Sequence, residues 1–134
     1  MLKIANPYYL VPGTVVSVRV GFFFHVGIVS DRHDCNGLPY VISNSARVGR
    51  GAEESWDVFS GGKTVYQEIG LESALPWPFV LVRAGNLMPK KWDLLSWNCE
   101  HFVREALGIK VESPQLQSAI AFGAFLSFFC LVKK

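Results

Sequence analysis

The 134-residue chain carries a formal net charge of +2, and half of its residues are hydrophobic whereas only 18% are charged. This length predicts one domain with a modest core, and so apolar a composition excludes global disorder. The weak charge, without a basic stripe interleaved with aromatic residues, indicates no nucleic-acid partner.

Three cysteines, Cys35, Cys99 and Cys130, make an odd number, and the sequence has no CxxC or Cys/His zinc spacing. A disulfide framework is therefore not expected, and the cysteines are expected to lie in a reducing compartment. The N-terminal stretch MLKIANPYYLVPG lacks the long apolar core of a secretory signal. These features predict that the chain is made and works on the cytoplasmic side.

Three segments in the first third of the chain are rich in β-branched or aromatic residues and are typical of strands. Gly21 separates the first two as a bend, and Asn36-Gly37 in the polar stretch RHDCNGL predicts a hairpin turn before the third. The predicted strands are 14–20, 22–31 and the returning strand 39–45.

The middle of the chain gives shorter signals. The stretch ARVGRG at 46–51 predicts a loop, and AEESWDVFSGGK at 52–63 predicts a short helical or extended stretch that ends at its glycine pair. Two further apolar runs, TVYQEI at 64–69 and FVLVRAG at 79–85, are expected to be strands.

The segment CEHFVREALGI predicts a helix that begins near Cys99, because its apolar residues recur at helical spacing. Asn98 is the expected N-cap and Gly108 the expected C-cap. The sequence shows no internal repeat. With strands first and a helix later, the expected fold is α+β, built around a small antiparallel sheet.

The tail LQSAIAFGAFLSFFCLV at 116–132 contains no charged residue and precedes two lysines. As a helix it would span roughly 25 Å, the short end for crossing a bilayer. Its apolar residues would lie all round, which favours burial in lipid or protein. We expect a catalytic domain at 1–112 and, at 113–134, an apolar helix that anchors to a membrane; the alternative is a helix packed within the protein or against a partner.

Cys99 allows three interpretations: a small buried hydrophobe, a metal ligand or a nucleophile. In the first turn of a helix it would lie near free N–H groups, which favour a thiolate and, with Asn98, could hold an oxyanion. Glu100 acts against the thiolate, since a nearby carboxylate disfavours it. A nucleophilic Cys99 would therefore need a cationic partner, usually histidine.

Two of the three histidines are poor partners for Cys99. His101 is two residues further along the same predicted helix and points roughly to the opposite side. His33 lies in the polar turn and is expected to be solvated. A metal site is not expected, because Cys99 and His101 at this spacing do not converge on one ion.

His25 is the candidate base, with a satisfied core histidine as the alternative. It shares one face of its strand with Gly27, which is expected to leave room beside the ring for a substrate or the nucleophilic helix. An imidazole in so apolar a strand must be paired. Ser43 or Asn44 on the returning strand could orient it, but only one of them, because adjacent strand residues face opposite ways.

Together, HVGIV at 25–29, VISN at 41–44 and NCEHF at 98–102 resemble the lecithin:retinol acyltransferase-like group of the NlpC/P60 superfamily. The resemblance covers roughly residues 10–108 and implies a permuted papain-like fold. The apolar tail is similar to the membrane anchors of animal phospholipase/acyltransferase members. The stretch GAEESWDVFSGG at 51–62 is similar to segments of bacterial members, which implies a bacterial or phage origin.

The resemblance implies that Cys99 is the nucleophile and His25 the general base, without a metal or other cofactor. The third polar residue of the group, often histidine, falls at Ser43. The implied activity is acyl hydrolysis or transfer through a Cys99 thioester, on a lipid or acyl substrate at a membrane surface. The alternatives are an amidase that cuts peptide or isopeptide bonds, and a catalytically degenerate module that binds membranes or partners.

Overall fold

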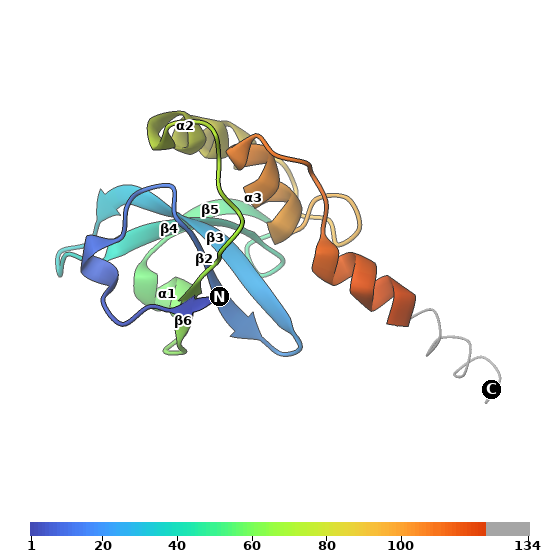
Figure 1. The fold of residues 1–134 in the computed structure, drawn as a ribbon, viewed down its shortest axis with the longest axis horizontal. Helices are drawn as coiled ribbons and strands as arrows, with labels where there is room; N and C mark the ends of the chain where they lie inside the picture. The colour runs from blue at the N-terminus through green and yellow to red at the C-terminus, as the bar shows by residue number, and fades with distance from the viewer. Residues whose placement is uncertain (123–134) are drawn as a thin grey trace.

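The β-branched segments of the chain form a single sheet in the computed structural model, which describes residues 1–122 (Figure 1). The strands are β1 (Leu2–Lys3), β2 (Val15–Val20), β3 (Phe23–His33), β4 (Pro39–Ser45), β5 (Arg50–Glu54) and β6 (Val65–Gln67). Neighbouring strands are antiparallel, in the order β1-β6-β2-β3-β4-β5. Helices accompany this sheet, and the expected α+β class is confirmed.

The predicted hairpin and its neighbours are confirmed, with shifted ends. β3 runs on to His33, and Asp34 makes the turn by accepting a hydrogen bond from Asn36 N–H, while Gly37 has a φ of 84°. The loop predicted at 46–51 is shorter than expected, because Arg50 already belongs to β5. The difference arises because β5 pairs with β4 as far as Ser45 and Arg50, so only residues 46–49 remain in the hairpin loop.

The helices are η1 (Pro7–Tyr9, a 3-10 turn), α1 (Trp56–Ser60), α2 (Trp77–Leu87) and α3 (Cys99–Leu107), with a further helical stretch at 114–122. The predicted start and end of α3 are confirmed. Asn98 is its N-cap, and Gly108 is its C-cap in the left-handed region, with a φ of 72°. Ser55 caps α1 in the same way, by accepting a hydrogen bond from Val58 N–H.

The strand predicted at 79–85 is wrong, because these residues lie in α2. A short apolar run does not distinguish a strand from a buried helix by its pattern alone. Pro78 in the first turn is compatible with a helix start. Val80 and Ala84, four residues apart, are the buried residues of α2, and they pack beside α3.

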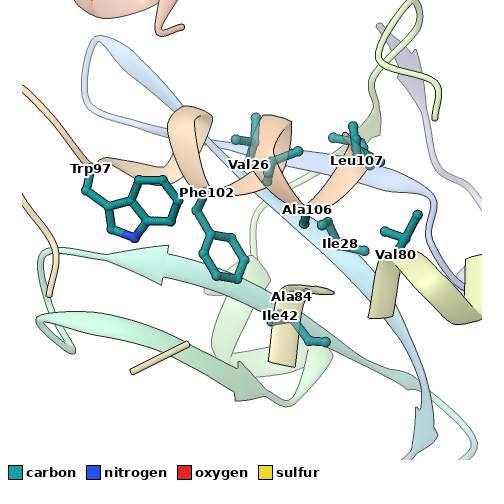
Figure 2. Close-up of a cluster of buried hydrophobic side chains, with 11 residues drawn as sticks. Val26, Ile28, Ile42, Val80, Ala84, Trp97, Phe102, Ala106 and Leu107 are labelled. Atoms are coloured by element: carbon teal, nitrogen blue, oxygen red, sulfur yellow. The ribbon is translucent and has the colours of Figure 1, made fainter. Parts of the chain in front are cut away.

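The sheet has a hydrophobic core on each face. Figure 2 shows the first, in which strand residues such as Ile28 and Ile42 meet α2 and α3. Phe102 of α3 lies at its centre and is fully buried. On the other face, valines of β2, β3, β4 and β6 pack against Trp56 and Phe59 of α1. Neighbouring residues of one strand therefore serve two different cores.

Gly27 allows α1 to approach the sheet closely. A Cβ atom there would lie 2.6 Å from Val41 Cγ1, 3.0 Å from Phe59 Cε2 and 3.1 Å from the Ile42 carbonyl oxygen. The space expected beside His25 for a substrate or the nucleophilic helix is thus filled by the protein's own core. Phe59 in turn packs on the His25 ring, with 5.4 Å between the ring centroids.

The predicted membrane segment 116–132 lies largely outside the described residues, as does Cys130. Within residues 1–122, none of the helices combines the length and the apolar character that a bilayer crossing requires. The described start of the tail is helical from 114 to 122.

The packing of Gly27 predicts opposite effects for two glycine substitutions. Gly27→Ala should lower the free energy of unfolding by about 1–3 kcal/mol, because its neighbours are a stiff buried valine and backbone. Gly85→Ala, inside α2 with open space around the added methyl group, should raise it by about 0.5–1 kcal/mol. Urea denaturation measures both, and a Gly27→Ala protein as stable as wild type would contradict the close contact.

Candidate functional site

The site lies where β3 and β4 separate. Their pairing reaches Ile28 and Ile42 and does not continue toward the start of β3. The first turn of α3 lies at this opening, where the nearby backbone N–H of Val26 acts to lower the pKa of the Cys99 thiol. Cys99 is partly buried and also contacts the core around Phe102. It thus lies between the hydrophobic core and an accessible face.

Asn98 fixes the start of α3 through a capping box. Its Oδ1 accepts hydrogen bonds from the N–H groups of Glu100 (3.0 Å) and His101 (3.3 Å). In return, the Asn98 N–H donates to His101 Nδ1 at 3.0 Å. His101 is therefore a structural residue that caps the helix, and burial lowers its pKa.

The Asn98 side chain is less free to hold an oxyanion than expected. Its Nδ2 already donates to the Leu94 carbonyl and to Ser113 Oγ, both at 3.1 Å. Within residues 1–122, the Cys99 N–H donates to no acceptor, and it belongs to the first turn of α3, where N–H groups lack partners within the helix. The Cys99 N–H is therefore the better placed donor for charge that develops beside Sγ.

The structure decides between Ser43 and Asn44 as the partner of His25. Ser43 Oγ lies 3.0 Å from His25 Nε2, on the face of the sheet that carries α1. This bond occupies Nε2 and leaves Nδ1 as the second ring nitrogen. Asn44 faces the other way, and its Nδ2 donates to the Trp97 carbonyl at 2.7 Å and to the Asn98 carbonyl at 3.4 Å.

Asn44 therefore holds the main chain that leads into Cys99. It is fully buried, and within the described part of the chain its Oδ1 has no hydrogen-bond partner. Peptide C=O and N–H groups point in opposite directions across a trans bond. By holding the Asn98 carbonyl, Asn44 helps to direct the Cys99 N–H away from itself, toward the opening.

His25 and Cys99 are both neutral in the free protein at neutral pH. Burial lowers the pKa of His25 to about 4, and the nearby Glu54 carboxylate offsets this only in part. Burial likewise raises the pKa of the Cys99 thiol to about 11. The Glu100 carboxylate also raises this pKa, whereas the Val26 N–H lowers it by a smaller amount than burial raises it. The thiolate expected from the helix N-terminus is thus not the resting form, because desolvation outweighs the N–H groups.

A cavity of about 620 Å³ connects the two residues, since both His25 and Cys99 line it. Its wall is mainly apolar, and it receives side chains from β2, β3, α1, the loop before α3 and the helical stretch 114–122. The apolar lining includes Val18, Phe23, Phe24, Val58, Phe59 and Leu116. The ion pair of Arg47 and Glu54 supplies charge at one side of the cavity.

The start of the tail closes one side of the cavity, which the sequence did not reveal. Glu100 Oε1 accepts hydrogen bonds from Ser113 Oγ at 2.5 Å and from the Gln115 N–H at 3.1 Å. The Gln115 side-chain amide makes two bonds to the main chain of Phe24, at 2.6 and 2.7 Å. The pair Ser113-Pro114 was the available signal, since serine before proline often starts a helix.

His33 and Cys35 lie outside this site. Both are exposed, His33 at the end of β3 and Cys35 in the turn that follows. In residues 1–122 no three His, Cys, Asp or Glu side chains come together in a way that could hold a metal ion.

The partly buried, neutral His25 predicts a loss of stability in acid. The unfolded chain binds a proton at an ordinary histidine pKa of about 6.5, whereas the folded chain binds it only near pH 4. The free energy of unfolding should therefore fall by about 2–3 kcal/mol as the pH drops through this window. His25→Gln should remove this part of the slope in urea denaturation, while His33→Gln, at an exposed position, should retain it. Equal slopes in both variants would contradict the burial of His25.

Comparison of the sequence with models of known protein families and with curated proteins finds no match. The chemistry of the site therefore has to be inferred from its own residues. These are a cysteine at a helix N-terminus and a histidine hydrogen-bonded to Ser43, and both line one apolar cavity.

Proposed function

We propose that the chain is a cysteine-dependent acyl hydrolase or acyltransferase that forms a thioester on Cys99 and acts on lipid acyl groups at a membrane surface. The observation that carries the proposal is the shared apolar cavity of about 620 Å³ with His25 and Cys99 in its wall. We also propose that the sheet and α3 correspond to a permuted papain-like arrangement, in which the histidine strand precedes the cysteine helix along the chain.

The first half of the reaction forms the thioester. His25 Nδ1 takes the thiol proton as Sγ attacks the acyl carbonyl carbon, so a carbon–sulfur bond forms and the carbonyl oxygen becomes an oxyanion. The Cys99 N–H donates a hydrogen bond to this oxyanion. When the intermediate collapses, the ester carbon–oxygen bond breaks, and the leaving alkoxide takes the proton from His25.

The second half releases the acyl group. Water, or an acceptor alcohol or amine, attacks the thioester while His25 Nδ1 accepts its proton. The carbon–sulfur bond breaks, and the proton returns to Cys99 to restore the neutral pair. Because His25 is neutral at rest, it is in the form that a general base requires. Ser43 holds the ring through Nε2 in both halves.

The cavity wall favours an acyl chain over a peptide. Aliphatic and aromatic side chains dominate the lining, and they bind a hydrocarbon chain by removing its surface from water. An extended peptide needs partners for its backbone N–H and C=O groups. Nevertheless, an amidase acting on peptide or isopeptide bonds is the alternative within the same chemistry, because the thioester steps are identical.

A catalytically inert binding module is the second candidate, and one observation favours it. Burial keeps the Cys99 thiol protonated and His25 unprotonated, which opposes a standing thiolate–imidazolium pair. The third polar position carries a serine, which orients the ring without adding charge. An inert module would use the apolar cavity to hold a lipid without cleaving it.

Intact-protein mass spectrometry after incubation with mixed phospholipids, followed by a rapid acid quench, tests the nucleophile. Wild type should gain a fatty-acyl mass that hydroxylamine removes, and Cys99→Ser should show neither the adduct nor fatty-acid release. Cys35→Ser, altered at an exposed turn cysteine, should behave as wild type. An adduct that persists in Cys99→Ser, or no adduct and no fatty-acid release in wild type, would remove the proposal and favour the inert module.

Ser43→Ala tests the positioning of His25. Loss of the hydroxyl removes the hydrogen bond to Nε2 and should lower kcat about 10- to 100-fold, the range typical of second partners that orient a histidine. Ser43→Thr, which keeps a hydroxyl group, should restore most of this loss. The free energy of unfolding, measured for both variants, separates positioning from misfolding. Unchanged kcat in Ser43→Ala would show that Ser43 has no role in turnover.

A further inference from the structure

Exposed apolar side chains surround the mouth of the cavity. Val20, Phe23 and Leu94 line the cavity, yet each remains about half exposed, at 52%, 48% and 54%. A side chain that both lines a cavity and faces solvent lies at its opening. The neighbours of these lining residues are also exposed and apolar. We call the group the rim, and it consists of Val20, Phe22, Phe23, Leu94, Leu95 and Ile120.

The tip of the β2–β3 hairpin is the most exposed part of the rim. Phe22 is 94% exposed, the highest fraction among the large hydrophobic side chains of residues 1–122, and it adjoins the exposed Phe23, so it extends a patch of the kind that marks interaction sites. The hairpin is not loose, because its strands pair up to Val20 and Phe23 and Gly21 makes the tight turn with a φ of 62°. The fold therefore presents Phe22 to solvent at a fixed place.

The loop before α3 presents its leucines in an equally fixed way. Asp93 and Trp97 exchange two main-chain hydrogen bonds, and the Asp93 carboxylate accepts from the N–H groups of Leu95 and Ser96. These bonds hold Leu94 and Leu95 outward, immediately before the residues that cap α3. The two leucines are 54% and 66% exposed.

The helical stretch 114–122 supplies the third side. Leu116 and Ala119 line the cavity, and Ile120 follows them at 52% exposure. The sequence contains no charged residue from 113 to 132, so the chain continues from the rim as an apolar segment. A rim continuous with such a segment fits a lipid surface better than a folded protein partner.

The charges near the rim also fit a lipid surface. Arg19 next to Val20, and Lys63 in the cavity wall, are exposed, and Lys63 Nζ donates to the Arg19 carbonyl at 2.8 Å. Among residues 1–122 neither Arg19 nor Lys63 forms an ion pair with a carboxylate. Two cations beside an apolar rim can meet lipid phosphates while the apolar side chains enter the acyl region.

We propose that the rim docks on a lipid bilayer, with Phe22 and its neighbours inserted among the acyl chains, so that the cavity opens directly into the hydrocarbon. The docking stands independently of catalysis, whereas the delivery of an acyl chain from the bilayer to Cys99 rests on the proposed function. This assigns membrane contact to residues of the folded domain, in addition to the tail.

Depth-dependent quenching tests the docking in the full-length protein. A tryptophan is introduced by Phe22→Trp, and the matched control is Phe79→Trp on α2, where the native side chain is also exposed, at 61%. The vesicles consist of phosphatidylcholine and phosphatidylglycerol with brominated acyl chains, and wild-type emission is subtracted. The tryptophan of Phe22→Trp should lose most of its fluorescence, because bromine quenches at short range inside the bilayer. The tryptophan of Phe79→Trp should keep its fluorescence, because it stays outside the bilayer.

A kinetic comparison follows the same two positions. The ratio of turnover on vesicle-borne ester to turnover on a soluble short-chain ester should fall about tenfold for Phe22→Ser and should not change for Phe79→Ser. Equal quenching at both positions, or none at position 22, would overturn the docking. If quenching occurs at position 22 but neither ester is turned over, the docking holds and the proposed function fails. If Cys99-dependent turnover occurs without quenching, the docking fails and the proposed function holds.

Discussion

The end of the β3–β4 pairing at Ile28 is the constraint on which the site depends. Had β3 and β4 stayed paired, the Val26 N–H would face a strand and α3 would have no opening at which to begin. Because they separate, opposite faces of β4 contribute to one site: Ser43 holds the histidine, and Asn44 holds the main chain that enters Cys99. Two adjacent residues of β4 therefore position both His25 and the main chain before Cys99.

Burial keeps both candidate catalytic groups uncharged in the free protein. The Cys99 thiol and the His25 imidazole are both uncharged, so the free protein does not bear the cost of a buried ion pair. A thiol in this form reacts slowly with solutes that only pass the cavity mouth. In the proposed reaction, the negative charge that develops on a bound carbonyl group would stabilise the protonated histidine and so favour proton transfer.

Much of this fold is readable from local chemistry. Side-chain types and their spacing predict the hairpin turn and the caps of α3. They also predict that adjacent residues of β4 face opposite sides of the sheet. The strand predicted at 79–85 failed because an apolar run fits either a strand or a buried helix, and tertiary packing against α3 decides. The sequence predicts space for a substrate beside Gly27, but whether this space stays open depends on Phe59, a residue more than thirty positions away. The cavity and the role of Gln115 likewise arise from long-range contacts that no local pattern encodes.

The bonds around Glu100 change how the end of the domain should be drawn. A boundary at 112, natural from the sequence, would separate Glu100 from Ser113 and Gln115 and leave its partly buried carboxylate beside Cys99 without those donors. The Phe24 main chain would lose its two amide partners as well. The first residues of the apolar tail are thus part of the cavity wall, and hydrogen bonds join them to both α3 and β3.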